Sequence, residues 1–96
     1  MLDIAVTGAA GRMGRNLIQA CYENSNCQLG AAIEHSSSPY IGRDAGEMAG
    51  VGTLNKTIAS QLIDVTDNFN TLVDFTRPEV TLQNLAICVA NGKNIV

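Results

Sequence analysis

The sequence predicts an α/β fold, a parallel sheet flanked by helices, in a single domain of 96 residues. A short apolar run at residues 4–6 leads through a turn of small residues into a helical pattern. A second apolar run follows at residues 29–33, and a third at residues 71–75 leads into another helical pattern. Because strands joined through helices run parallel, these runs predict one parallel sheet.

The first unit consists of a strand at residues 2–7 and a helix at residues 11–23. The apolar positions of the helix recur at helical spacing and are Met13, Leu17, Ala20 and Cys21. A polar turn at residues 24–26 then leads into a second strand at residues 28–34.

Small residues fill the turn between the first strand and helix: Gly8, Ala9, Ala10 and Gly11, with Gly14 following inside the helix. Gly8 lets the chain reverse sharply, and Gly14 lets the helix lie close to the strand. The spacing G-x-x-G-x-x-G differs from the dinucleotide fingerprint, but Ala10 is small enough for its second glycine slot. The N–H groups at the helix start suit a pyrophosphate, whereas a plain tight turn is the alternative interpretation.

An acid follows the second apolar run. Glu34 lies about 20 positions after Gly14, near the spacing expected for the acid that binds the adenosine ribose. A carboxylate has two acceptor oxygens for a vicinal diol and repels a 2′-phosphate. A solvated acid at a strand end is the alternative. Turn and acid together predict a Rossmann-like parallel sheet that binds a dinucleotide.

The middle of the chain is less regular. Residues 35–53 are rich in glycine and serine and predict a long surface loop with a short helical turn at residues 44–48. Loops of this length are often functional, although a tolerated insertion is an equal alternative. A short strand is expected at residues 57–59 and a short helix at residues 60–65.

The last third of the chain repeats the strand and helix pattern. After the strand at residues 71–75, Pro78 suits the first position of a helix and Glu79 complements its N-terminus. The apolar stripe of this helix comprises Leu82, Leu85, Ala86 and Val89. Gly92 ends the helix, and residues 93–96 begin another strand. We therefore expect a fragment of a longer protein, a Rossmann-like sheet truncated at its C-terminal side.

Composition excludes several function classes. The chain is 46% hydrophobic and 16% charged, with a net charge of −3 and no basic cluster, which argues against nucleic-acid binding. It contains no apolar run long enough to span a membrane and no signal peptide, so a cytoplasmic location is expected. Cys21, Cys27 and Cys88 form no CxxC pair, and His35 is the only histidine, so we expect reduced thiols and no metal site.

Four stretches carry a resemblance to a known family. Residues 6–15 (VTGAAGRMGR), 30–34 (GAAIE), 42–46 (GRDAG) and 74–79 (DFTRPE) resemble the N-terminal part of dihydrodipicolinate reductases, also called 4-hydroxy-tetrahydrodipicolinate reductases. The resemblance covers essentially the whole chain. It implies the N-terminal NAD(P)-binding domain, at residues 1–96, of an oxidoreductase of the diaminopimelate route to lysine.

The resemblance also assigns cofactor-binding residues. It implies a pyrophosphate loop made of Gly8, Ala9, Ala10, Gly11, Arg12 and Met13. Glu34 would hold the ribose, and Thr76 and Arg77 would line the cleft near the pyrophosphate or the adenine. Position 35 is often an arginine that pairs with a 2′-phosphate. Here it is His35, which favours NADH over NADPH, or use of both with help from Arg12.

The resemblance places the catalytic histidine and lysine in a second domain, so no catalytic residue is assigned within residues 1–96. The parent enzyme is expected to be a homo-oligomer that binds its small-molecule substrate through that domain, and the 96-residue chain alone is expected to be inactive. A non-catalytic NAD-sensing Rossmann module is the alternative. A domain for coenzyme A is a third, which Glu34 disfavours because that ribose carries a 3′-phosphate.

Overall fold

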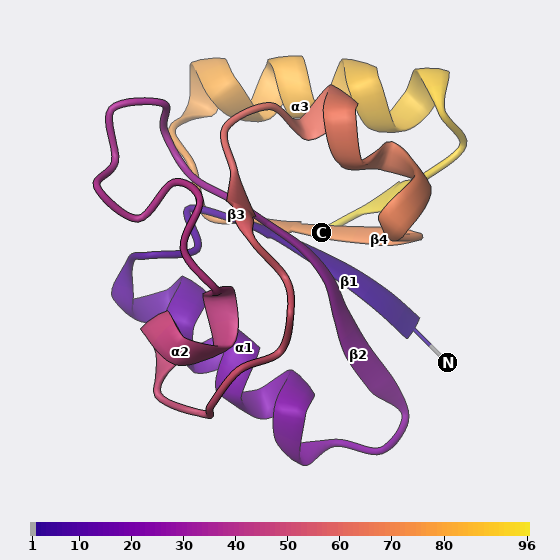
Figure 1. Cartoon of the computed structure of the whole chain (residues 1–96). Coiled ribbons are helices and arrows are strands. Elements are labelled where there is room, and N and C mark those ends of the chain that lie inside the picture. Colours follow the sequence, from indigo (N-terminus) through magenta and orange to yellow (C-terminus); the bar gives the residue numbers. More distant parts are fainter. Residues whose placement is uncertain (1) are drawn as a thin grey trace.

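The computed structural model describes residues 2–96 as a five-stranded sheet with helices on both faces (Figure 1). The strands are β1 (Leu2–Thr7), β2 (Cys27–Ile33), β3 (Ile58–Ala59), β4 (Thr71–Asp74) and β5 (Asn94–Ile95). The helices are α1 (Arg12–Glu23), α2 (Ala45–Ala49), the 3₁₀ helix η1 (Leu62–Asn68) and α3 (Pro78–Ala90). None of the helices in residues 2–96 has both the length and the apolar character needed to cross a membrane.

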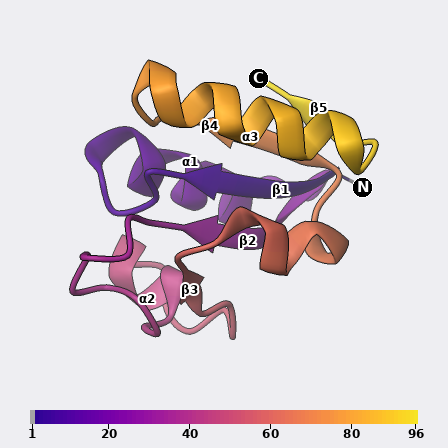
Figure 2. The same cartoon turned by 90° about the horizontal axis from the view of Figure 1, so that it is seen from above.

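All strand pairs are parallel, and the strand order is β3-β2-β1-β4-β5, as the predicted α/β class requires. Figure 2 shows β1 in the middle, with β2 and β3 on one side and β4 on the other. The chain order therefore reverses between β1 and β4. In an open α/β sheet such a reversal point is where ligands bind, beyond the carboxyl ends of the strands.

The core lies in two layers because side chains alternate between the faces of a strand. Ile4 and Val6 of β1 pack on the face covered by α1 and α2, where Ile18 and Cys21 are buried. Ala5 faces the other side, in the cluster that also contains the fully buried Cys88 of α3. Cys21 and Cys88 are thus buried in the two core layers, one on each face of the sheet.

The bounds of the first unit agree with the predictions to within one residue. The strand β1 spans the predicted residues, and α1 begins at Arg12 because Gly11 is its extended N-cap. The apolar stripe of α1 is shifted, since the helix buries Gly14, Ile18 and Cys21 while Met13 is 57% exposed.

The prediction of a helix at residues 60–65 was wrong in type and in bounds. The structure has the 3₁₀ helix η1 at Leu62–Asn68, and its regular turns are interrupted at Val65, whose backbone is not helical. This short segment lacks the repeated apolar spacing that identifies a longer helix from sequence.

The helical turn predicted at residues 44–48 is present as α2, shifted by one residue. Its Ala45 and Ala49 are buried against the same core layer as α1, so this part of residues 35–53 is packed on the core. The side chain of Asp44 accepts hydrogen bonds from the backbone N–H groups of Glu47, Leu54 and Lys56, each at 3.0 Å. Burial raises the pKa of Asp44, but these hydrogen bonds outweigh it, so its pKa lies below the usual range. One carboxylate thus organises the segment.

The apolar stripe of α3 does not face the sheet. Its members are all exposed, namely Leu82, Leu85, Ala86 and Val89. The buried face of α3 instead carries Asn84 and Cys88, and Asn84 donates a hydrogen bond to Asp74 at 3.3 Å. The helix is oriented by a polar contact with the end of β4, which hydrophobic spacing alone does not reveal.

Candidate functional site

The carboxyl ends of β1, β2 and β4 meet at the turn that contains the predicted glycines. The turn follows β1, Glu34 follows β2, and Phe75 follows β4. The N–H of Phe75 donates to the carbonyl of Thr7 at 3.3 Å, which ties the end of β4 to the start of the turn. The predicted site residues are therefore gathered at the point where the strand order reverses.

Glycine is required at the first position of this turn. Gly8 has a φ of 68°, a left-handed conformation that side chains disfavour, and an added Cβ would lie 3.0 Å from the carbonyl oxygen of Phe75. The N–H of Gly11 donates back to the carbonyl of Gly8 at 3.1 Å, and the N–H of Ala9 donates to Ile33 at 3.2 Å. These bonds hold the turn in one compact shape.

Gly14 brings α1 close to the turn itself rather than to the strand. An added Cβ at Gly14 would lie 2.4 Å from the carbonyl oxygen of Gly8 and 2.7 Å from the Cα of Ala9. No side chain among residues 2–96 caps the N-terminus of α1 at Gly11. The first N–H groups of α1 therefore lie beside the turn without a side-chain acceptor, as an anion-binding helix start requires.

The carboxylate of Glu34 points at the turn. Its Oε2 accepts a hydrogen bond from the N–H of Ala10 at 2.9 Å, and its Oε1 accepts one from the N–H of His35 at 2.9 Å. The backbone N–H of Glu34 donates to Ala59 at 2.9 Å, which anchors the residue between β2 and β3. The predicted acid and the predicted loop are thus in direct contact.

Arg15 is a site residue that the sequence reasoning missed. Its Nε donates to the carbonyl of Ala10 at 2.8 Å, and its guanidinium lies 5.1 Å from the centre of the Tyr40 ring. The same side chain donates to the carbonyl of Met48 at 3.5 Å. Arg15 therefore connects the turn to the segment at residues 35–53, a contact for which no spacing rule gives a signal.

A cavity of about 470 Å³ lies beside the contacts that Arg15 makes with Tyr40 and Met48. Its lining consists of Arg15, Tyr40, Arg43, Asp44, Glu47 and Met48. The ordered segment around α2 therefore forms one wall of the site region.

His35 is exposed, and its side chain makes hydrogen-bond contacts within its own loop. Its Nδ1 lies 2.8 Å from the hydroxyl of Ser37 and accepts the backbone N–H of that residue at 3.2 Å. Both contacts lie within the loop that follows β2, so the side chain of His35 interacts with its own segment.

Thr76 and Arg77 differ in their surroundings. The hydroxyl of Thr76 donates to the carboxylate of Asp74 at 2.6 Å, so this side chain is held at the end of β4. Arg77 is the N-cap residue of α3, and its side chain is 80% exposed and lies 3.9 Å from Glu79. Both follow β4 next to the turn, and the polar contacts of their side chains are with Asp74 and Glu79.

Asp74 joins β1, β4 and α3 and was not singled out from the sequence. Its carboxylate accepts hydrogen bonds from the hydroxyls of Thr7, Thr76 and Thr81. Burial raises its pKa, but the hydrogen bonds outweigh that effect, so the pKa of Asp74 lies below its usual range. The charged carboxylate therefore fixes the strand end that borders the turn.

The structure thus brings together residues 8–11 and Glu34, with the backbone of Phe75 beside them. Arg12 and Met13 lie exposed in the first turn of α1, adjacent to residues 8–11. His35 and Arg77 are at the border of the region, and their side chains interact with neighbours in their own segments.

A comparison with known families matches almost the entire chain. The family described as "Dihydrodipicolinate reductase, N-terminus" matches residues 2–96. The chain belongs to this family. The resemblance that the sequence motifs indicated is therefore confirmed along residues 2–96.

Solved structures show the same fold in larger proteins. The dihydrodipicolinate reductase from Paenisporosarcina sp. TG-14, solved with dipicolinate, has a TM-score of 0.70 and 19% identity over 99% of this chain. The aspartate semialdehyde dehydrogenase from Candida albicans, solved with NADP, has a TM-score of 0.73 and 13% identity over 99% of this chain. This chain spans 36% of the first structure and 28% of the second. At these identities the likeness establishes the Rossmann-like fold.

Proposed function

We propose that this chain binds NADH or NADPH as the cofactor-binding portion of a dihydrodipicolinate reductase of the diaminopimelate route to lysine. The bound cofactor would supply the hydride that reduces 4-hydroxy-tetrahydrodipicolinate. The observation that carries the proposal is the contact of the Glu34 carboxylate with the Ala10 N–H, at 2.9 Å. This contact supports the proposal because it sets a carboxylate suited to ribose hydroxyls beside a turn suited to phosphates.

The unused lone pairs of Glu34 fit a ribose. An ionised carboxylate offers about four acceptor positions. The N–H groups of Ala10 and His35 occupy one position on each oxygen. One position remains on each oxygen, which matches the two hydroxyl donors of a vicinal diol.

The turn fits a pyrophosphate for independent reasons. The close approach of Gly14 to Gly8 leaves the helix start uncovered by side chains, and Gly11 adds no bulk at the N-cap. Arg12 and Met13 extend from the first turn of α1, where Arg12 can meet a phosphate oxygen. We assign residues 8–13 to the phosphates on this basis.

We further propose that NADH is preferred. A 2′-phosphate would approach the negative charge of Glu34, and His35 lacks the bidentate guanidinium fork that an arginine would offer that phosphate. Thr76 and Arg77 are assigned to the border of the cleft, because both follow β4 beside the turn.

Substrate binding, catalysis and subunit contacts are assigned to other parts of a whole reductase. This chain spans 36% of the dihydrodipicolinate reductase structure to which it is similar. No group of three or more histidine, cysteine or acidic side chains in residues 2–96 is arranged to hold a metal ion. We therefore expect the 96-residue chain to bind cofactor without turning over substrate.

Replacement of Glu34 tests the proposal. In the Glu34→Ala variant, NADH affinity should fall about 5- to 150-fold, because a charged hydrogen bond worth about 1–3 kcal/mol is lost. NADPH and coenzyme A, whose riboses carry a phosphate, should not weaken. Affinities are measured by NMR titration of the isotope-labelled chain, which also detects weak complexes.

Glu23→Ala is the matched control, because Glu23 is an exposed acid at the opposite end of α1. It should leave all three affinities unchanged. An unchanged NADH affinity in Glu34→Ala would contradict the role of Glu34. Steady consumption of NADH by the wild-type chain with substrate would contradict the assignment of catalysis to other parts of the enzyme.

A further inference from the structure

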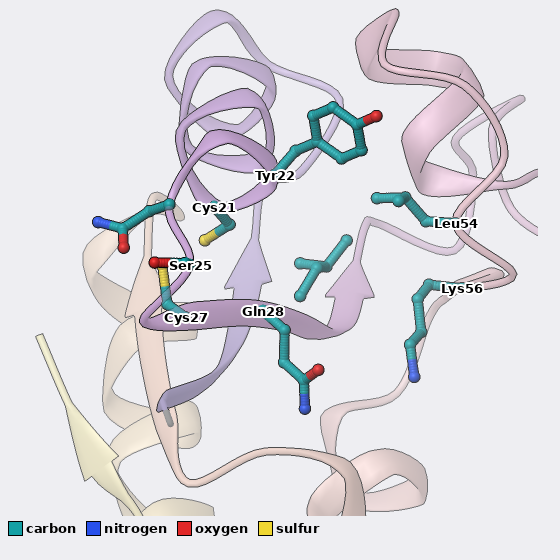
Figure 3. Close-up of a pocket in the computed structure, with 9 residues that line it drawn as sticks. Cys21, Tyr22, Ser25, Cys27, Gln28, Leu54 and Lys56 are labelled. Carbon is teal, nitrogen blue, oxygen red and sulfur yellow. The ribbon is translucent and has the colours of Figure 1, made fainter.

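Two cysteine side chains share a cavity at the end of the sheet opposite to the cofactor turn. Cys21 lies near the end of α1, and Cys27 is the first residue of β2. Both line a cavity of about 340 Å³, with Leu54 and Lys56 among the residues of its other wall (Figure 3). Figure 3 shows the two thiols next to each other where α1 turns into β2.

A tight turn holds the pair together. The N–H of Asn24 donates to the carbonyl of Cys21 at 3.3 Å, and the N–H of Cys27 donates to the carbonyl of Asn24 at 3.5 Å. The N–H of Asn26 also donates to the Asn24 side chain at 2.8 Å. The short connection therefore returns the chain to the end of α1, and both cysteines belong to the same core layer.

We infer that Cys21 and Cys27 form a redox-active dithiol, a modification site at which a small disulfide such as glutathione disulfide oxidises the pair to an intramolecular disulfide. The Cys27 thiolate attacks one sulfur of the reagent, forms a mixed disulfide and releases one glutathione thiolate. The Cys21 thiolate then attacks the Cys27 sulfur and releases the second. Two protein thiols are oxidised by two electrons, the reagent is reduced to two thiols, and the protons pass to water.

Exposure sets the order of the two steps. Cys27 is half-buried and reaches the cavity, whereas Cys21 is 3% exposed. Burial, and then the neighbouring Cys27, raise the pKa of Cys21 to about 11. Because thiolates are the attacking species and burial of Cys21 disfavours its thiolate, closure by Cys21 should be the slower step and should accelerate as the pH rises.

Peptide mapping of the wild-type chain tests the inference. The chain is equilibrated in buffers with increasing ratios of oxidised to reduced glutathione, quenched in acid, alkylated after unfolding and digested. We expect peptides containing Cys21 and Cys27 to become linked, while Cys88, buried on the other face of the sheet, remains alkylatable. The melting temperature of the oxidised chain should rise by roughly 5–10 °C, since the cross-link restricts the unfolded chain.

Phenylarsine oxide, which binds two adjacent thiols together, provides a second measurement. The reduced wild-type chain should bind one equivalent, and the conservative variant Cys27→Ser should lose this binding. A Cys27–glutathione adduct that never closes, a link to Cys88, or equal arsenical binding by Cys27→Ser would each overturn the inference. The wild-type mapping decides the question even if a variant folds poorly.

Discussion

Gly14→Ala should disrupt the turn that we assign to the phosphates. The added Cβ would lie 2.4 Å from the Gly8 oxygen, about 1 Å closer than ordinary contact at 3.4 Å, and 2.7 Å from backbone atoms of Ala9. Both contacts are with backbone, so the turn or the helix must move. Overpacking of this kind costs about 1–3 kcal/mol. The higher helix propensity of alanine offsets at most about 1 kcal/mol of that cost.

Gly11→Ala is the matched control. An added Cβ at Gly11 lies 3.4 Å from the Gly8 oxygen, and the backbone of Gly11, at φ −73°, is one that alanine adopts readily. Its unfolding free energy should therefore stay within about 0.5 kcal/mol of the wild type. Urea denaturation followed by circular dichroism measures both variants. Equal stability of the two variants would refute the packing argument.

Three further predictions concern Asp74, the outer face of α3 and the core of the sheet. Asp74→Asn should lower the unfolding free energy by about 1–3 kcal/mol, because hydroxyl donors lose their charged acceptor. The wild-type chain should lose this contribution as the pH falls through the lowered pKa of Asp74, and urea denaturation at several pH values should show a flatter acid limb for the variant. Val89→Gln should change stability by less than about 0.5 kcal/mol because Val89 is 72% exposed. In the same urea assay, Leu72→Ala should cost about 2–5 kcal/mol because Leu72 is fully buried.

Local sequence patterns predicted the elements that form the site. The apolar run of β1, the small residues of the turn and the helical spacing of α1 are neighbours in sequence, so local rules describe them. Glu34 was found from its distance to Gly14 along the chain. The number of residues between Gly14 and Glu34 is predictable because α1 has a nearly fixed length when it must return the chain to an adjacent parallel strand.

Side-chain contacts between different elements were not predicted. The side chain of Arg15 donates a hydrogen bond to the carbonyl of Met48. The carboxylate of Asp74 accepts hydrogen bonds from hydroxyl groups of β1, of the segment after β4 and of α3. The spacing of these residues in the sequence does not indicate such contacts. The orientation of α3 follows from the same cause. Thr81 and Asn84 contact Asp74 and turn the helix, so its most apolar side, which includes Leu85, faces outward.

The direction of Glu34 depends on a feature inside β2 that the sequence reading treated as ordinary strand. The pairing of β1 with β2 shifts register, because Ile4 pairs with Leu29 whereas Ala5 pairs with Ala31. Gly30 is therefore the extra residue of a β-bulge. A side chain there would be impossible without rearrangement, because its Cβ would lie 2.0 Å from the carbonyl oxygen of Asn68.

Beyond this bulge, each side chain of β2 points to the face of the sheet opposite to the one that strict alternation would give it. Leu29 packs on the α1 face, and strict alternation would place Ala31 there as well. With the bulge, Ala31 packs on the α3 face and Ala32 on the α1 face. Glu34, two positions after Ala32, then projects toward α1 and the turn rather than away from them. One glycine in β2 thus determines that the carboxylate meets the Ala10 N–H.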